Sequence, residues 1–402
     1  MMRVTSFLLL LVSIISRTSL VAASSSASSS SGDDGFVRLV AWMRRYGGRV
    51  DARMDVAEIN GVRGIVALAD IEDGAELLHC PWSLVIGSTG LHDQMQTKDM
   101  CRVVRELADE FGAGDASLWW PYLEHIQLPR LAAMWEPSAS EELQGLSPSE
   151  DATRHLVWFA QTCGGKDDRG IDAEEMRSLV SFVLRASEVG MVPIYDLLNH
   201  HNGEKNAKLR LSDAGVQLVV VGGPVRQGQE LYLSYGVKTA STMYRDYGFV
   251  EAWPCCWNWK DAASGDNFAF VMFPDGVAAI NPTADFLRQL WNSKSAVRKP
   301  VAEFQASARR HMDSLPVEEL VRFARAARTH LEGLPTTWRE DGAILGQKKE
   351  LLAQTPDAND AASRTAQDVI SAIEYRSTFK KALESALISS ETAARILMGQ
   401  DL

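Results

Sequence analysis

The sequence predicts an α+β protein in which a β-rich domain, interrupted by a helical insert, is followed by an all-α C-terminal domain. Strand-like segments at 56–86 and 207–234 combine β-branched runs with glycine turns. Helical periodicity dominates residues 88–188 and returns after about residue 282. The strands are therefore expected on both sides of a helical stretch, with helices alone at the C-terminal end.

Length and composition are those of an ordinary soluble protein. The chain has 402 residues, of which 46% are hydrophobic and 23% charged, enough for two or three domains with a core. The formal net charge is -11, and no dense Lys/Arg stripe offsets it. This argues against nonspecific nucleic-acid binding and fits a basic partner, such as a lysine-bearing segment.

The N-terminal residues have the composition of a targeting segment. Arg3 precedes an apolar run from Phe7 to Ile15, and small residues end the segment at Ala23. Residues 1–23 are therefore predicted to be a signal or targeting peptide, followed by a disordered Ser-rich linker at 24–35. The apolar run is short for a membrane span, so none is expected in the mature chain. Secretory entry and complex-plastid targeting both fit this segment.

The predicted elements follow in order along the chain. A helix is expected at 36–47, because its apolar residues fall on one face. The segment at 56–86 reads as short strands with glycine turns at Gly61 and Gly64. Near the C-terminus, Thr337 followed by Glu340 indicates a helix start with a capping box.

These elements predict two domains. The first spans 36–275 and carries its helical insert at about 88–182. The second spans 282–402 and is helical throughout. No fixed-period repeat is present.

The cysteines predict neither a metal site nor a disulfide framework. The chain has five, and no two have metal-ligand or redox spacing. The adjacent Cys255 and Cys256 are expected to be small buried residues. His200 and His201 lack a third ligand at suitable spacing, so no metal site is predicted.

Candidate functional residues concentrate between 193 and 249. Asp196-Leu197-Leu198-Asn199-His200 offers several hydrogen-bonding groups in an apolar frame, although a helix end with an Asn C-cap would look the same. Tyr235 before Gly236, and Tyr247, could position a reacting amine or be half-buried strand tyrosines. The turn at 61–67 fails the dinucleotide fingerprint and alone predicts only a hairpin.

In their order, these signals resemble the SET-domain protein methyltransferases of the Rubisco large-subunit lysine methyltransferase-like class, which includes the actin histidine methyltransferase. The matching features are the glycine-turn strand, the long insert, Arg185 and the motifs Asp196-Leu197-Leu198-Asn199-His200, Gly228-Gln229-Glu230, Tyr235-Gly236 and Asp246-Tyr247-Gly248-Phe249. Segments 121–135, 334–341 and 372–376 resemble the insert and the helical substrate-binding domain of that family, so the resemblance covers roughly 36–390.

The resemblance implies a site for S-adenosyl-L-methionine (SAM) and a SET domain followed by a Rubisco LSMT-like substrate-binding domain. Tyr235 would be the catalytic tyrosine, supported by Tyr247. The cofactor-binding residues would be Gly61, Val62, Arg63, Arg185, Asp196, Asn199, His200, Tyr247, Gly248 and Phe249. The chain departs from the family at Val62, where Gly is usual, and at Leu184, where Ser or Thr is usual.

The implied activity is protein-lysine N-methylation, with a protein presenting lysine as the partner and no metal. Protein-histidine N-methylation is an alternative, because Asn199-His200-His201-Asn202-Gly203 is similar to the actin-modifying branch. A non-catalytic SET-fold scaffold is an alternative of another class. Relatives of this family are cytoplasmic or nuclear, whereas the signal-like N-terminus suggests secretory or plastid entry.

Overall fold

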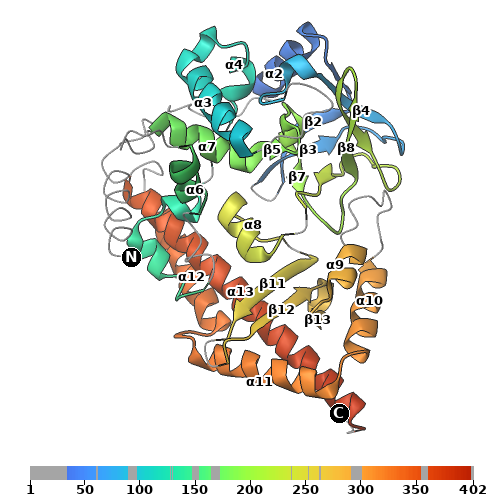
Figure 1. Cartoon of the computed structure of the whole chain (residues 1–402), viewed down its shortest axis with the longest axis vertical. Coiled ribbons are helices and arrows are strands. Elements are labelled where there is room, and N and C mark those ends of the chain that lie inside the picture. Colours follow the sequence, from blue (N-terminus) through green and yellow to red (C-terminus); the bar gives the residue numbers. More distant parts are fainter. Residues whose placement is uncertain are drawn as a thin grey trace. The chain divides into compact units, whose positions relative to one another are not determined.

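The computed structural model has the α+β class that the sequence predicts. It describes residues 34–59, 62–88, 97–126, 128, 130–146, 154–163, 173–236, 238–251, 253–261, 264–290, 301–354 and 361–399. The predicted targeting peptide at 1–23 and nearly all of the predicted linker lie outside these residues. Figure 1 shows the chain coloured along its sequence.

The chain divides into two compact units that interleave in sequence. Unit 1 comprises Met1–Leu128, Arg154–Asn199 and Asn206–Tyr232, and unit 2 comprises Pro129–Thr153, His200–Lys205 and Leu233–Leu402. These units differ from the predicted domains at 36–275 and 282–402, because a stretch of the insert and the last strands group with the C-terminal helices. The chain passes from unit 1 to unit 2 between Asn199 and His200.

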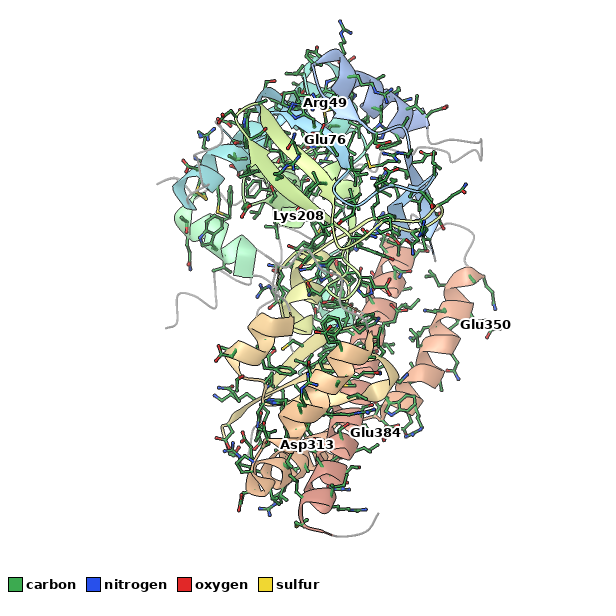
Figure 2. All side chains as sticks on the ribbon, turned by 90° about the vertical axis from the view of Figure 1, so that its right-hand side faces the viewer. Arg49, Glu76, Lys208, Asp313, Glu350 and Glu384 are labelled. Atoms are coloured by element: carbon green, nitrogen blue, oxygen red, sulfur yellow. A yellow bond between two sulfur atoms is a disulfide. The ribbon has the colours of Figure 1, made fainter. Side chains whose placement is uncertain are left out.

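The largest sheet of unit 1 is antiparallel. It is formed by β1 (Arg49–Val50), β4 (Glu76–Pro81), β9 (Gly215–Val220) and β8 (Ala207–Ser212), in that order. Across β1 and β4, Arg49 pairs with Glu76 at 2.7 Å from Nη2 to Oε1; both residues are labelled in Figure 2.

Short strand pairs complete the strands of unit 1. The hairpin of β2 (Met54–Ile59) and β3 (Val62–Ala67) also pairs along its other edge, where Leu231 N donates to Ile65 O at 2.8 Å. Another pair is β5 (Ala186–Ser187) with β6 (Gly190–Met191). The strands β7 (Asn199–His200) and β10 (Tyr232–Leu233) pair with each other, and each begins in unit 1 and ends in unit 2. The turn η4 (Tyr195–Leu197) leads into β7, so Asn199 lies in a strand and is not a helix C-cap.

Helices form the insert as predicted. The predicted N-terminal helix is also present, as α2 (Asp34–Arg45). Between β4 and β5 the described elements are helical: η1 (Trp82–Leu84), α3 (Thr97–Ala113), η2 (Gly114–Ala116), α4 (Trp120–Leu123), η3 (Ala132–Met134), α5 (Pro137–Glu141), α6 (Arg154–Thr162) and α7 (Ala173–Arg185).

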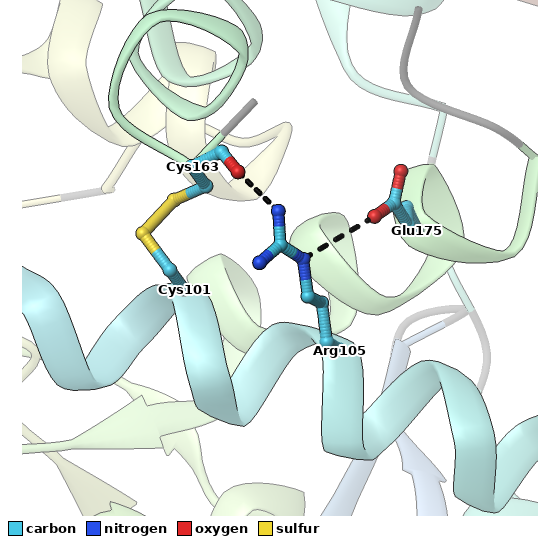
Figure 3. Close-up of a disulfide and its surroundings, with 4 residues drawn as sticks. All are labelled: Cys101, Arg105, Cys163 and Glu175. Atoms are coloured by element: carbon cyan, nitrogen blue, oxygen red, sulfur yellow. Dashed lines mark hydrogen bonds and ion pairs between the residues drawn. A yellow bond between two sulfur atoms is a disulfide. The ribbon is translucent and has the colours of Figure 1, made fainter. Parts of the chain in front are cut away.

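A disulfide joins two of these helical segments in unit 1. Cys101 of α3 is bonded to Cys163, the residue after α6, although the sequence spacing did not predict this pair. Figure 3 shows Arg105 beside it, donating to the Cys163 carbonyl and lying 3.7 Å from Glu175 of α7. The other three cysteines are buried thiols, as expected for Cys255 and Cys256.

Unit 2 packs a small sheet against helices. The antiparallel strands are β11 (Cys255–Lys260), β12 (Asn267–Met272) and β13 (Ala278–Ile280). From residue 284 on, every described element is helical: α9 (Ala284–Leu290), α10 (Val301–Asp313), α11 (Val317–Gly333), α12 (Trp338–Ala353) and α13 (Ala361–Leu397). Trp257 of β11 contacts Tyr375 and Phe379 of α13, which closes the core between sheet and helix.

A buried charge network fixes the insert stretch to the helices of unit 2. Asp341 lies 2.7 Å from Lys380 and 2.9 Å from Arg376, and all three side chains are at most 2% exposed. Arg376 also binds the Glu142 carboxylate. Such charges are tolerated in a core only when each has a partner, so this network helps to specify how the stretch around Glu142 packs. The capping box predicted at Thr337 is confirmed.

Within the described part of the chain, no helix is both long enough and apolar enough to cross a bilayer.

Candidate functional site

In unit 1 the side-chain amide of Asn199 is held by two acceptors. Its Nδ2 donates to the carbonyl of Arg63 at 3.0 Å and to Glu230 Oε1 at 2.7 Å. The hydroxyl of Tyr232 donates to the other oxygen of Glu230 at 2.6 Å, which fixes the carboxylate in turn. Because both amide hydrogens are committed, Asn199 can offer a ligand only its Oδ1, which is a hydrogen-bond acceptor.

Gly64 makes room for this arrangement. It lies within β3 opposite Ala57, and a Cβ on it would overlap Glu230 Oε1 and lie 2.8 Å from Asn199 Nδ2. The sequence suggested a turn glycine here, whereas the structure requires close approach of the two side chains to the strand. Gly61 lies outside the described residues, and Val62 opens β3 with 56% of its surface exposed.

Unit 1 also brings Arg185 and Asp196 together. Arg185 ends α7, and its Nη1 lies 3.0 Å from Asp196 Oδ2 in η4. The hydroxyl of Tyr122 donates to the same oxygen at 2.7 Å, and the Asp196 side chain is only 1% exposed. Burial and the nearby Asp196 raise the pKa of Tyr122, so its phenol stays a donor. Asp196 is therefore a buried acceptor that orients the Arg185 guanidinium.

In unit 2 the ring of His200 is fully enclosed. Its Nδ1 accepts a hydrogen bond from the backbone N–H of Tyr235 at 2.8 Å, and its Nε2 lies 3.1 Å from Glu251 Oε2. The sequence predicted His200 as a cofactor residue. Because the ring is fully buried, a contact of His200 with a cofactor would come from its backbone.

Four aromatic side chains of unit 2 meet at this point. The ring centroids of Tyr235 and Tyr247 are 4.9 Å apart, and the His200 ring is 5.0 Å from Tyr235 and 6.2 Å from Phe249. Tyr247 ends α8 (Ala240–Tyr247), and Gly248 follows with φ +79°. This left-handed turn, which favours glycine, brings Phe249 back to 6.3 Å from Tyr247.

The aromatic cluster already attracts an ammonium group. Lys238 Nζ lies 5.7 Å from the centre of the Tyr247 ring, within the range of a cation–π interaction. Burial, with the nearby Asp246, raises the pKa of Tyr247 to about 12. The Tyr247 phenol is therefore protonated at neutral pH and presents a neutral, electron-rich face to a cation.

Sequence reasoning gave no role to three supporting residues of unit 2. Glu251, which follows Phe249-Val250, accepts from Asn202 N at 2.6 Å and from Asn202 Nδ2 at 2.9 Å. The hydroxyl of Ser234 donates to Asn202 Oδ1 at 2.5 Å. In the sequence, Glu251 is an acidic residue directly after two apolar residues, and a glutamate on the protein surface would have the same pattern.

Neither histidine of the predicted pair is arranged for metal. His201 Nδ1 accepts from the backbone of Gly203 and Glu204, both at 3.1 Å, and so closes a turn. Among the described residues, no group of three or more His, Cys, Asp or Glu side chains could hold a metal ion.

The arrangement of strands and helices is the SET fold. Solved structures with the same fold include the SET domain of LSMT bound to methyl-lysine and AdoHcy, with a TM-score of 0.54 over 90% of this chain and 92% of that chain. Rubisco LSMT bound to AdoMet gives a TM-score of 0.52 over 91% of this chain and 93% of that chain. The sequence identity is 16% in both cases, so the likeness is one of fold. No protein-family model and no curated protein matches the sequence.

Proposed function

We propose that the chain is a SAM-dependent protein-lysine N-methyltransferase acting on a folded protein or an exposed segment. The observation that carries the proposal is the fold, which spans nearly the whole chain and occurs in structures bound to AdoMet, AdoHcy, lysine and methyl-lysine. The residues that the family resemblance assigns to the site match the family's pattern except at Val62, where Gly is usual, and Leu184 departs from it beside Arg185.

The contacts of unit 1 suit the amino-acid end of SAM. Asn199 has only its Oδ1 acceptor to offer, which matches a protonated amino group. Arg185 would meet the cofactor's carboxylate, because a guanidinium pairs well with that group. The family resemblance assigns Gly61, Val62 and Arg63 to the same end.

The family resemblance assigns residues of unit 2 to the adenine and the methyl group. The backbone of His200 offers the donor and acceptor that an adenine edge needs, with Gly248 and Phe249 beside it. Tyr235 would lie at the methyl group, with Tyr247 against its ring.

Bound SAM supplies a methyl group on a positively charged sulfur, and the protein's task is to present a neutral amine in line with it. The phenol of Tyr235 would orient the amine and contact the polarised methyl through weak CH···O interactions. Tyr247, with a pKa of about 12, is not a base at neutral pH. The substrate lysine would lose its proton to solvent, and desolvation beside the positively charged sulfur would favour that loss.

A labelling experiment tests the proposal. Purified protein, radiolabelled SAM and a source-cell extract are incubated, and the modified residue is identified by mass spectrometry. We expect methyl-lysine, and a loss of turnover in Tyr235→Phe with nearly unchanged SAM affinity by calorimetry. Label on histidine would favour the histidine alternative. Failure of the wild type to bind SAM would favour a scaffold and refute the proposal.

We further propose that the chain folds in an oxidising compartment. The Cys101–Cys163 disulfide supports this, because structural disulfides persist in secretory and similar environments and are rare in reducing ones. The signal-like segment at 1–23 agrees with such a route. Fractionation of source cells under thiol-blocking conditions tests the compartment, and a cytosolic protein with all cysteines reduced would contradict it.

A further inference from the structure

The polar interior of unit 2 is organised around one carboxylate. Glu251 has a side chain that is 4% exposed, and it accepts two hydrogen bonds and lies beside a histidine ring. Both hydrogen bonds come from Asn202, at 2.6 and 2.9 Å, and His200 Nε2 lies 3.1 Å from Glu251 Oε2. A buried carboxylate is costly unless it is compensated in this way, so the arrangement is strongly specified.

The hydrogen bonds fix the protonation of the His200 ring. Its Nδ1 accepts from the Tyr235 backbone N–H, so this nitrogen carries no hydrogen. A ring that accepts at Nδ1 carries its hydrogen on Nε2, the nitrogen that lies 3.1 Å from Glu251 Oε2. A carboxylate this close to Nε2 disfavours a lone pair on that nitrogen, so Glu251 favours the tautomer that can accept from Tyr235.

A second branch from Glu251 reaches the preceding residue. Asn202 donates its side-chain N–H to Glu251, which leaves its Oδ1 to accept from the hydroxyl of Ser234. The two branches thus end on consecutive residues, Ser234 through its side chain and Tyr235 through its backbone.

Ser234 and Tyr235, the residues at the ends of the two branches, do not lie in a strand. β10 ends at Leu233, and Gly236 turns the chain with φ +96°. Between these points the backbone of Tyr235 is anchored by the imidazole of His200, whose ring also packs 5.0 Å from the tyrosine ring.

We propose that Glu251 is a positioning residue for the candidate catalytic tyrosine, acting on Tyr235 through His200 and on Ser234 through Asn202. This inference rests on the proposed methyl-transfer function. Glu251 touches neither substrate nor cofactor in this role. It sets where the Tyr235 phenol lies, and a displacement of about 1 Å can reduce turnover by about a hundredfold.

Two substitutions of His200 separate positioning from simple packing. His200→Asn places an amide oxygen near the position of Nδ1 and keeps an acceptor for the Tyr235 N–H. His200→Gln places its amide near the position of Nε2 and leaves that N–H without its acceptor. We expect kcat to fall by at least about tenfold more in His200→Gln than in His200→Asn, with similar melting temperatures.

Glu251→Gln is the direct test. The carboxamide keeps the size of the side chain, but it replaces one accepting oxygen by an NH2 group and removes the negative charge beside His200, so we expect kcat to fall by about ten- to a hundredfold. The affinity for SAM should change by less than about twofold, because the change acts on Tyr235 and spares the cofactor contacts. An unchanged kcat, or a SAM affinity lost in proportion to kcat, would overturn the inference.

A spectroscopic measurement makes the test independent of activity. In protein labelled with 15N-tyrosine, the eight tyrosine amides give few signals, and Tyr235→Phe identifies the one from Tyr235. This signal should shift in Glu251→Gln and His200→Gln and stay near its wild-type position in His200→Asn. An unmoved signal in Glu251→Gln refutes the inference. Wild-type protein that shows these shifts but neither binds SAM nor transfers a methyl group refutes the proposed function instead.

Discussion

Removal of the disulfide in unit 1 should destabilise the protein by a large and calculable amount. Cys101 and Cys163 are separated by 62 residues. In the loop-closure model, a crosslink over a loop of this length lowers the entropy of the unfolded chain enough to contribute about 4 kcal/mol. The closed loop includes residues 129–153, the stretch that belongs to unit 2. Without the bond, the unfolded chain therefore gains conformational entropy in segments of both units.

The assay is urea unfolding of wild type and Cys101→Ser without reductant. Cys163→Ser and the double variant should lose the same free energy as the single variant, because all three lose one bond and its contribution is counted once. Thiol counting supplies the internal control. Three of the five cysteines are buried thiols, and burial raises the pKa of Cys80 to about 12.

Native protein should therefore take up almost no alkylating agent at pH 8. Unfolded, unreduced protein should take up three equivalents, and reduced protein five. Five reactive thiols in unfolded, unreduced wild type would show that the disulfide is absent. A free energy of unfolding of Cys101→Ser within about 1 kcal/mol of wild type would show that the bond contributes little.

Three further predictions concern the candidate site. Asn199→Ala should weaken SAM binding by about ten- to a hundredfold, measured by calorimetry, and an unaltered affinity would remove Asn199 from the site. Gly64→Ala should cost about 1–3 kcal/mol of stability and impair SAM binding, because its Cβ would overlap Glu230. Gly346→Ala, an exposed helical position with open space, is the control and should be neutral or stabilising. Stability should fall as pH rises from about 10 to about 12, because unfolded phenols lose protons near pH 10 while Tyr247 holds its proton up to about 12. Urea unfolding at several pH values should show a shallower fall in Tyr247→Phe, and equal slopes would contradict the assigned burial.

Local signals in the sequence predicted local structure well. The helix expected at 36–47 forms at Asp34–Arg45, and the capping box at Thr337 is present, because both depend on residues within a few positions of one another. The disulfide was not predictable, because it depends on how α3 and α6 pack. The grouping of 129–153 with unit 2 was hidden for the same reason. It depends on Arg376 binding Glu142, 234 positions away in the chain.

In the polar motifs, the sequence alone could not distinguish residues that would contact a ligand from residues that hold them in place. Three of the candidate cofactor residues are each held by a carboxylate: Arg185 by Asp196, Asn199 by Glu230 and His200 by Glu251. In the sequence, the residue that meets a ligand and the residue that holds it look alike, since both are polar residues in apolar frames. Burial and hydrogen-bond direction separate them. Asn199 must donate to Glu230 and so can only accept from a ligand, whereas the buried His200 ring accepts from the Tyr235 N–H and lies beside Glu251. The carboxylates thus determine what each neighbour can still offer to a bound molecule, and substitution of a carboxylate should change the site as much as substitution of the residue it holds.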